Sequence, residues 1–182
     1  MRLPLVCSIF LVLATLSVAV GCASEERPGP ATGTPLGPGA VVEAEVDRVV
    51  DGDTVDVRLP TGDVARVRLL GIDTPEAAIP DEPPECFGPE ATERARRLLP
   101  EGARVQVLTD PRGEDVDGFG RVLAYVDRDG DSVNRALIRS GHAEVFAFND
   151  RRFQRRPDFE EAERRARDEM RGLWGACDAS VR

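Results

Sequence analysis

Two short segments in which apolar and charged residues alternate constrain the fold of this chain most strongly. Residues 55–59 read Val-Asp-Val-Arg-Leu, residues 65–69 read Ala-Arg-Val-Arg-Leu, and residues 60–63 between them have the composition of a turn. Alternation with a period of two is typical of a strand with one buried face, so these segments predict a β-hairpin. Arg66 and Arg68 then project from the face opposite the core, on a rigid strand.

The rest of the domain continues with short strands and adds helices. Pro89 favours the start of a helix and Pro100 its end, whereas Ser132 and Gly141 favour the two ends of a shorter helix. Further strands are expected at residues 105–107 and 122–126, and a last helix at residues 158–171. This order of strands and helices within residues 41–178 predicts one small α+β domain built on a β-barrel.

The basic residues of the expected last helix have acidic partners four positions earlier. The predicted ion pairs are Glu160 with Arg164, Glu161 with Arg165 and Glu163 with Arg167. Pairs in this order stabilise an exposed helix face. The run of arginines therefore favours a solvated face over a patch that binds nucleic acid.

The N-terminal part of the chain has the composition of an export signal followed by a spacer. One charge, on Arg2, precedes an apolar run over residues 3–20, which is typical of a signal peptide and predicts one over residues 1–21. The residues around Cys22 resemble a bacterial lipobox, so we expect lipidation of Cys22; a cleaved and released form and an uncleaved anchor are the alternatives. Residues 22–40, rich in Pro, Gly, Ala and Thr, predict a disordered linker. We therefore expect an exported protein, either a membrane-anchored lipoprotein or a secreted form.

Two cysteines remain within the predicted domain, because Cys7 leaves with the signal and Cys22 is the candidate for lipidation. Leftover cysteines in an oxidising compartment usually pair. The sequence therefore favours a disulfide between Cys86 and Cys177, with two free thiols as the alternative.

The ionisable residues exclude several kinds of active site. All 24 basic residues are Arg, which excludes lysine-based chemistry, and His142 is the only histidine. A Ser-His-Asp triad or a zinc site with several imidazoles is therefore not supported. We expect His142 to be exposed and assign it no role. Any chemistry must rest on carboxylates and guanidinium groups.

Three segments gather carboxylates or an arginine at strand ends, where functional residues tend to lie. They are residues 49–55 (VVDGDTV), 68–76 (RLLGIDTPE) and 117–121 (DGFGR). Each alone is also compatible with a turn or a helix cap. Together and in this order they resemble the thermonuclease family, also called staphylococcal nuclease-like domains, and the resemblance covers nearly all of residues 41–174.

The resemblance implies a fold and an activity. The family's fold is an OB-fold five-stranded β-barrel with three helices, which agrees with the expected order of elements. Its activity is calcium-dependent hydrolysis of phosphodiesters in DNA and RNA, with 3′-phosphate products. The alternative is a non-catalytic module of the same fold that binds nucleic acid or protein.

The resemblance also implies a metal site. Asp53 and Asp73 match the carboxylate ligands of Ca2+, and the backbone carbonyl of Thr74 matches a further ligand. Asp51 matches a carboxylate that lies near the ion without ligating it. Calcium prefers such oxygen ligands. Residues 127–131 (DRDGD), in contrast, lack the EF-hand spacing and predict a hairpin turn.

Three further residues match the groups that act on the substrate. Glu76 matches the general base that orients or deprotonates the attacking water. Arg68 and Arg121 match two arginines that hold the scissile phosphate, because a planar guanidinium can bind two phosphate oxygens and neutralise developing charge. This division of roles requires no histidine.

The chain departs from the family where the nucleotide is contacted. Gly118 and Phe119 stand where many members have Lys-Tyr, so we expect Phe119 to contact a base or sugar and nucleotide binding to be weaker. Phe146 and Phe148 lie where the family usually places aromatic residues around the nucleotide, with core positions as the alternative. The net charge of -9 repels polyanions. We therefore expect modest affinity for nucleic acid and a preference for single-stranded or short substrates. We also expect the protein to be a monomer.

Overall fold

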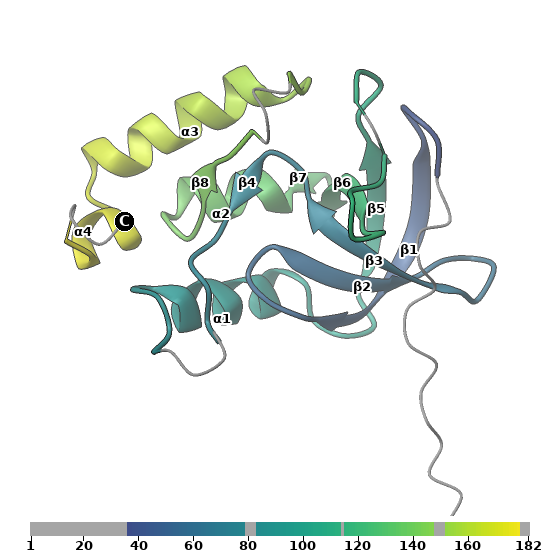
Figure 1. Ribbon diagram of the computed structural model, residues 1–182, viewed down its shortest axis with the longest axis horizontal. Coiled ribbons are helices and arrows are strands. Elements are labelled where there is room, and N and C mark those ends of the chain that lie inside the picture. The colour runs from purple at the N-terminus through teal and green to yellow at the C-terminus, as the bar shows by residue number, and fades with distance from the viewer. Residues whose placement is uncertain (1–35, 79–82, 114, 148–151, 179–182) are drawn as a thin grey trace, which may run out of the picture.

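The computed structural model describes residues 36–78, 83–113, 115–147 and 152–178. Five strands form a closed barrel (Figure 1): β1 (Val41–Val49), β2 (Thr54–Arg58), β3 (Val64–Leu69), β5 (Arg104–Thr109) and β6 (Val122–Arg128). Their order is β3-β2-β1-β5-β6 with antiparallel neighbours, and a parallel pairing of β3 with β6 closes the barrel. The predicted OB-fold five-stranded barrel of the α+β class is confirmed.

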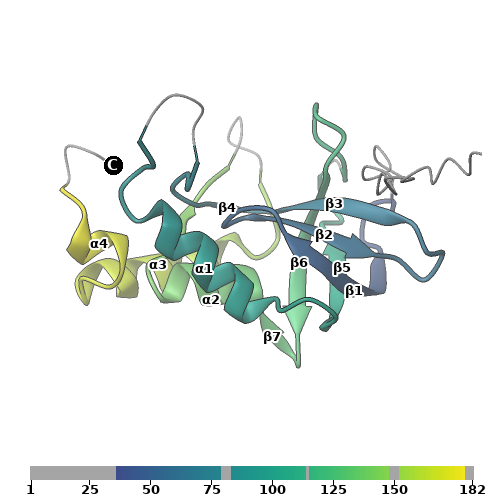
Figure 2. The ribbon, with the colours of Figure 1, turned by 90° about the horizontal axis from the view of Figure 1, so that it is seen from below.

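The helices lie beside the barrel, on the left in Figures 1 and 2. The three predicted helices are present, followed by one further helical turn: α1 (Gly88–Leu98), α2 (Val133–Arg139), α3 (Arg156–Asp168) and α4 (Leu173–Ala176). The short strands β4 (Ile72–Asp73) and β8 (Glu144–Val145) pair with each other, and β7 (Asp131–Ser132) pairs antiparallel with the end of β6. The β4–β8 pair, which includes Asp73, lies between the barrel and α3 (Figure 1).

The β2–β3 hairpin has the predicted alternation. Its inward residues, such as Val57 and Val67, are buried in the main core. Asp56, on the outer face, is only 1% exposed, because Arg48 and Arg66 donate to its two carboxylate oxygens at 2.9 and 2.8 Å. Ion pairs therefore cover this part of the outer face.

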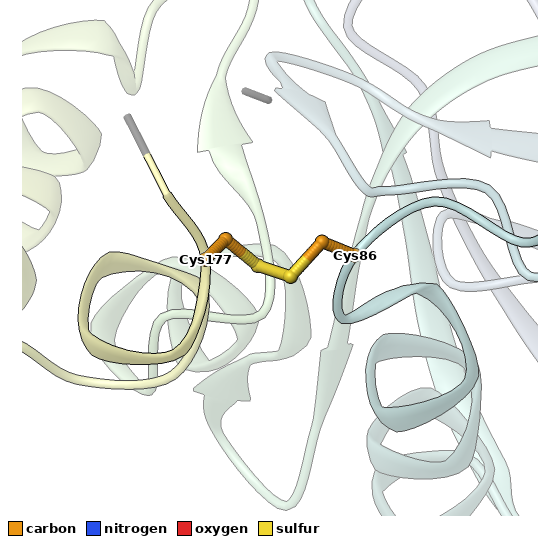
Figure 3. Close-up of a disulfide and its surroundings, with 2 residues drawn as sticks. All are labelled: Cys86 and Cys177. Carbon is orange, nitrogen blue, oxygen red and sulfur yellow. A yellow bond between two sulfur atoms is a disulfide. The ribbon is translucent and has the colours of Figure 1, made fainter. Parts of the chain in front are cut away.

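A second, smaller apolar cluster joins the C-terminal helices to the start of α1. It consists of Ala166, Leu173, Trp174 and Cys177, with Phe87 packed against it. A disulfide links Cys86 to Cys177 (Figure 3), with a Cα–Cα distance of 5.9 Å. The predicted pairing is confirmed, and it connects this cluster to the segment that precedes α1.

The end of the predicted linker lies against the domain, so the prediction of disorder is wrong for residues 36–40. Leu36 packs on the main core. The N–H groups of Gly37 and Ala40 donate to side-chain oxygens of the domain at 2.8 and 2.9 Å. A Pro/Gly-rich composition did not prevent order here, because the backbone gained these partners.

The predicted signal peptide, the possible lipidation site Cys22 and most of the linker lie outside the described residues. None of the helices in the described part of the chain is long and apolar enough to cross a bilayer. The expectations about export and anchoring therefore stay predictions.

The predicted last helix differs from α3 at both ends. It starts earlier, at Arg156, because Pro157 is accommodated in its first turn, and it ends at Asp168, since Met170 has a left-handed φ of 50°. Two of the three predicted ion pairs form, Glu161 with Arg165 and Glu163 with Arg167, whereas Glu160 pairs with Arg156. The exposed face of α3 therefore carries several ion pairs, as predicted.

His142 is half-buried, which corrects the expectation of an exposed residue. Its ring centroid lies 5.0 Å from that of Phe87, and its Nδ1 is 3.0 Å from the carbonyl oxygen of Ser140. Burial lowers the pKa of His142. The ring therefore packs against Phe87, at the start of α1.

The segment 127–131 forms the predicted hairpin turn. Asp129 and Gly130 have left-handed φ angles of 54° and 87°, as a two-residue hairpin turn requires, and Arg128 pairs with Asp131 across it. Asp127 holds both terminal nitrogens of Arg155, at 2.6 and 2.8 Å. This carboxylate is thus engaged in a structural ion pair.

Asp110 is a buried carboxylate that ties the end of β5 to β6 and to the segment before α3. Its oxygens accept hydrogen bonds from Tyr125 Oη at 2.5 Å, Gln154 N at 2.6 Å and Arg112 N at 2.8 Å. Replacing Asp110 by alanine removes the acceptor for all three donors. We expect a loss of about 3–5 kcal/mol in the free energy of unfolding, measured by urea denaturation.

The matched control is Tyr125→Phe, which removes one of the three donors and keeps the carboxylate. This variant should lose only about 1–2 kcal/mol. If Asp110→Ala were no less stable than Tyr125→Phe, Asp110 would not organise this junction.

Candidate active site

The turn between β1 and β2 holds two of the predicted carboxylates. The N–H groups of Val50 and Asp51 donate to the carbonyl oxygen of Thr54 at 2.9 and 3.2 Å, and Asp51 Oδ1 accepts from Asp53 N at 3.1 Å. Aspartate favours turns through such bonds to its own backbone neighbours. The carbonyl oxygen of Asp53 accepts from Leu69 N at 2.8 Å. Asp53 is thereby fixed against the end of β3.

Arg68, at the end of β3, joins Asp53 to Asp73. Its Nη2 lies 3.0 Å from Asp53 Oδ2 and 2.6 Å from Asp73 Oδ1. Its Nη1 donates to the carbonyl oxygens of Ile72 and Leu69 at 2.7 and 3.2 Å. Because both carboxylates contact the same nitrogen, the turn after β1 and strand β4 converge on one point.

Thr74 holds the other side of the Asp53 carboxylate. Its N–H and its Oγ1 donate to Asp53 Oδ2 at 3.0 and 3.2 Å. Gly52 permits this approach, since a Cβ at position 52 would lie 2.5 Å from Thr74 Oγ1 and 2.8 Å from Thr74 Cβ. Close packing therefore requires the glycine of the Asp-Gly-Asp turn.

The carboxylates of this region repel one another. Burial raises the pKa of Asp53 to about 7 against the opposing effect of Arg68, and Asp51 and Asp73 raise it further. Partial burial of its carboxylate also raises the pKa of Glu76, although the side chain is largely exposed, and repulsion from Asp51 and Asp73 adds to the effect. The cluster thus favours additional positive charge beyond Arg68, and a divalent cation supplies it.

Ready-made side-chain ligands for such a cation are few. In the described part of the chain, no three carboxylate, histidine or cysteine side chains are grouped as a metal site. Asp53 and Asp73 would therefore need backbone and water oxygens as companions. Calcium accepts such mixed oxygen ligands.

Glu76 follows β4, and its backbone is held by Glu85. Glu76 N donates to Glu85 Oε2 at 2.9 Å, and Glu85 N donates to the carbonyl oxygen of Glu76 at 2.9 Å. The Glu76 side chain is exposed. It is open to water, as a general base for water must be.

Arg121 lies at the entrance to β6 and is oriented by Asp117. Its backbone N and its Nε donate to Asp117 Oδ1 and Oδ2 at 2.9 and 2.7 Å. Although partial burial opposes the effect, the hydrogen bonds from Arg121 hold the pKa of Asp117 below its ordinary value. The Arg121 guanidinium carbon lies 5.4 Å from the centre of the Phe119 ring.

Arg68 and Arg121 line the same cavity, which has a volume of about 300 Å³. Aromatic side chains form part of its wall, namely Phe119, Phe146 and Phe153. Phe119 is 83% exposed, and Phe146 is exposed as well, so neither is a core residue. Phe148 lies outside the described residues. Two guanidinium groups beside exposed rings suit a phosphate next to a planar, apolar group.

A neighbouring cavity, also of about 300 Å³, adjoins the carboxylates. Asp73, Thr74, Glu85 and Phe146 line it, and Phe146 borders both cavities. Asp73 and Thr74 therefore line one cavity, and Arg68 and Arg121 line the cavity beside it.

The structure brings together the site residues that the sequence predicted, and their roles stay predictions. Sequence reasoning missed two contributors, Glu85 and Asp117. Asp117 stands four residues before Arg121, so their opposite charges were a usable signal. Glu85 lies nine residues beyond Glu76 in a Pro-rich stretch, where no periodicity indicates contact.

Comparison with known proteins supports a single family. Residues 66–176 match the family model described as staphylococcal nuclease homologue. The chain is 36% identical over 134 residues to the SPbeta prophage-derived endonuclease YokF of Bacillus subtilis, covering 74% of this chain and 44% of that protein. It is 33% identical over 134 residues to endonuclease YncB of the same organism, covering 74% of this chain and 62% of that protein.

A third relative is matched over most of its own length. The thermonuclease of Staphylococcus hyicus is 31% identical over 131 residues, which cover 71% of this chain and 74% of that protein. The chain spans less than two thirds of the length of the two Bacillus relatives. The family model covers more than half of the chain and includes Arg68, Asp73, Glu76 and Arg121. The chain therefore belongs to the staphylococcal nuclease homologue family.

Proposed function

We propose that this protein is a calcium-dependent nuclease that hydrolyses phosphodiesters of DNA and RNA and leaves 3′-phosphates. One observation carries the proposal: Arg68 contacts both Asp53 and Asp73, and it also lines the cavity that Arg121 borders. Two carboxylates suited to a cation thus adjoin two guanidinium groups suited to a phosphate. The relatives named endonuclease and thermonuclease support the nuclease part of this proposal.

Asp53, Asp73 and the backbone carbonyl of Thr74 would hold the calcium ion. Their oxygens are of the type that calcium prefers, and the mutual repulsion of the carboxylates fits a divalent cation. When bound, the ion would neutralise phosphate charge and favour ionisation of water. Asp51, which accepts the Asp53 N–H, keeps the turn in place.

Glu76 would take a proton from the attacking water. As the water oxygen bonds to phosphorus, the bond from phosphorus to the 5′-oxygen breaks, and that oxygen takes a proton from solvent, so the phosphate stays on the 3′-oxygen. The raised pKa of Glu76 brings it closer to neutral pH, which suits proton transfer. Arg121 and Arg68 would neutralise the charge that builds on the phosphoryl oxygens.

The test is cleavage of a fluorogenic oligonucleotide by the purified protein in Ca2+ and in EDTA. We expect cleavage in Ca2+ that EDTA abolishes and excess Ca2+ restores, with 3′-phosphates found by product-end analysis. Cleavage that persists in EDTA would contradict the metal dependence. Binding of the oligonucleotide without cleavage would favour the alternative, a non-catalytic module of the same fold.

We also propose a preference for single-stranded or short substrates. Phe119 and Phe146 are exposed beside the cavity, where unpaired bases can stack on their rings. The net charge of -9 opposes the approach of a long duplex. Equal cleavage rates for single-stranded and duplex forms of one sequence would contradict this preference.

We propose export as the location, either as a lipoprotein anchored to the membrane through Cys22 or as a secreted protein, and a monomeric state. The disulfide supports export, because disulfides persist in oxidising compartments.

Gly52→Ala should weaken metal binding at the site rather than substrate binding. The added Cβ would collide with Thr74, which must then move away from Asp53. Changes around metal ligands typically cost 10–100-fold in affinity or activity, so we expect the Ca2+ concentration for half-maximal cleavage to rise about 10–100-fold. An unchanged Ca2+ requirement in folded Gly52→Ala would contradict this account of Thr74.

A further inference from the structure

We propose that Glu85 is a positioning residue for Glu76 and that the Cys86–Cys177 disulfide holds Glu85 in place, so that cleavage depends on the oxidised protein. This inference rests on the proposed function, because it concerns the general base of that reaction. It assigns a catalytic consequence to a disulfide that lies outside the barrel.

The Glu76 carboxylate has little to hold it directly. It forms no hydrogen bond or ion pair with another described residue, and its side chain is exposed. Its position is therefore set by its backbone. Both hydrogen bonds that fix this backbone come from Glu85, one through the side chain and one through the N–H group.

The start of α1 supports the same contact. The N–H of Gly88 donates to the carbonyl oxygen of Glu85 at 3.0 Å. A Cβ at Gly88 would lie 2.2 Å from the carbonyl oxygen of Glu76, so the two backbones are packed without space for a side chain. The position of Glu76 therefore depends on the segment of residues 85–88.

That segment needs support from outside. Phe87 has a φ of 71°, a left-handed conformation that costs a residue with a side chain about 1–2 kcal/mol. In addition, Glu85 and Asp73 line one cavity, and their like charges repel each other. Strain and repulsion both act to open the segment.

The disulfide and the second apolar cluster oppose this opening. Cys86 lies next to Glu85 in the chain, and its bond to Cys177 crosses to the segment after α4 (Figure 3). Phe87 packs against the cluster that contains Cys177 and Trp174. The C-terminal part of the domain therefore holds in place the segment of residues 85–88, which positions Glu76.

Reduction of the disulfide should disturb the position of the general base, Glu76, more than that of the other site residues. A dithiol reductant transfers two electrons and two protons to the disulfide, giving two thiols and the cyclic disulfide of the reductant. The segment 85–88 is then released, whereas Asp53, Arg68 and Arg121 stay fixed by the barrel. We expect kcat to fall about 100-fold, as for a misplacement of about 1 Å, while KM and the Ca2+ requirement change little. An exported nuclease of this design would gain full activity only after oxidation.

The activity test compares the oxidised protein with the same protein reduced by dithiothreitol and with the Cys86→Ser/Cys177→Ser variant, at a temperature where circular dichroism shows each to be folded. Glu85→Ala should lose kcat like the reduced protein, and Glu85→Gln, which keeps a carbonyl acceptor for Glu76 N, should regain most of it. Glu93→Ala, on the exposed face of α1, is the matched control and should keep full activity. Full kcat in the folded, reduced protein would overturn the inference, as would a loss that matches the unfolded fraction.

A second measurement does not depend on activity. Backbone amide exchange of Glu76 and Glu85, followed by nuclear magnetic resonance, should become at least about tenfold faster on reduction, while the Leu69 amide at the Asp53 turn stays protected. Unchanged exchange at Glu76 would overturn the inference even if the protein cleaves nucleic acid. If the oxidised protein shows no cleavage but its Glu76 exchange responds to reduction, the proposed function fails and the positioning by Glu85 stands.

Discussion

Glu76→Gln should lower kcat by about 10²–10⁴-fold and leave KM and the Ca2+ requirement nearly unchanged. Glutamine has the size of glutamate but cannot accept a proton from the attacking water. The Glu76 side chain forms no hydrogen bond or ion pair with another described residue, so its replacement breaks no contact of the fold. Single-turnover cleavage of a fluorogenic oligonucleotide at saturating Ca2+ measures the effect on chemistry.

Glu93→Gln is the control, because it makes the same chemical change on the exposed face of α1. It should match the wild-type protein in all three parameters. Undiminished cleavage by Glu76→Gln would remove Glu76 from the role of base. A large rise in KM with unchanged kcat would instead assign Glu76 to substrate binding.

The barrel was predictable because its signals are local. The alternation in residues 55–69 depends on one buried face, and the prolines at 89 and 100 bracket a helix without reference to the rest of the chain. The resemblance of the motifs to the family then predicted that the strands close into an OB-fold barrel. The boundaries that failed depend on tertiary partners: residues 36–40 became ordered because the domain offers acceptors for Gly37 and Ala40.

The candidate site was predictable in its members but not in its contacts. The motif identified Arg68 as a phosphate ligand, and sequence alone does not show that its Nη2 also joins Asp53 to Asp73. That contact arises because β4 brings Asp73 back to the end of β3. Likewise, Asp53 and Glu85 reach their partners only through the folded turn and the start of α1, which no periodicity encodes.

These contacts distinguish the two arginines. Arg68 uses both terminal nitrogens within the protein, whereas Arg121 donates to Asp117 only through its backbone N and Nε. No hydrogen bond to a described residue uses Nη1 or Nη2 of Arg121. Because Arg121 also lines the cavity, its terminal nitrogens keep donors available for phosphate oxygens.

Arg121→Lys should accordingly lower kcat by about 10²–10³-fold without changing the Ca2+ requirement. Lysine keeps the positive charge but loses the planar fork that binds two oxygens and the Nε bond to Asp117. Arg68→Lys should lower kcat as well, but it should also change the Ca2+ concentration for half-maximal cleavage, since Asp53 and Asp73 lose the nitrogen that joins them. Calcium titrations of the cleavage rate of both variants test this division of roles. An altered Ca2+ requirement in Arg121→Lys would contradict it. An unaltered Ca2+ requirement in Arg68→Lys would contradict it as well.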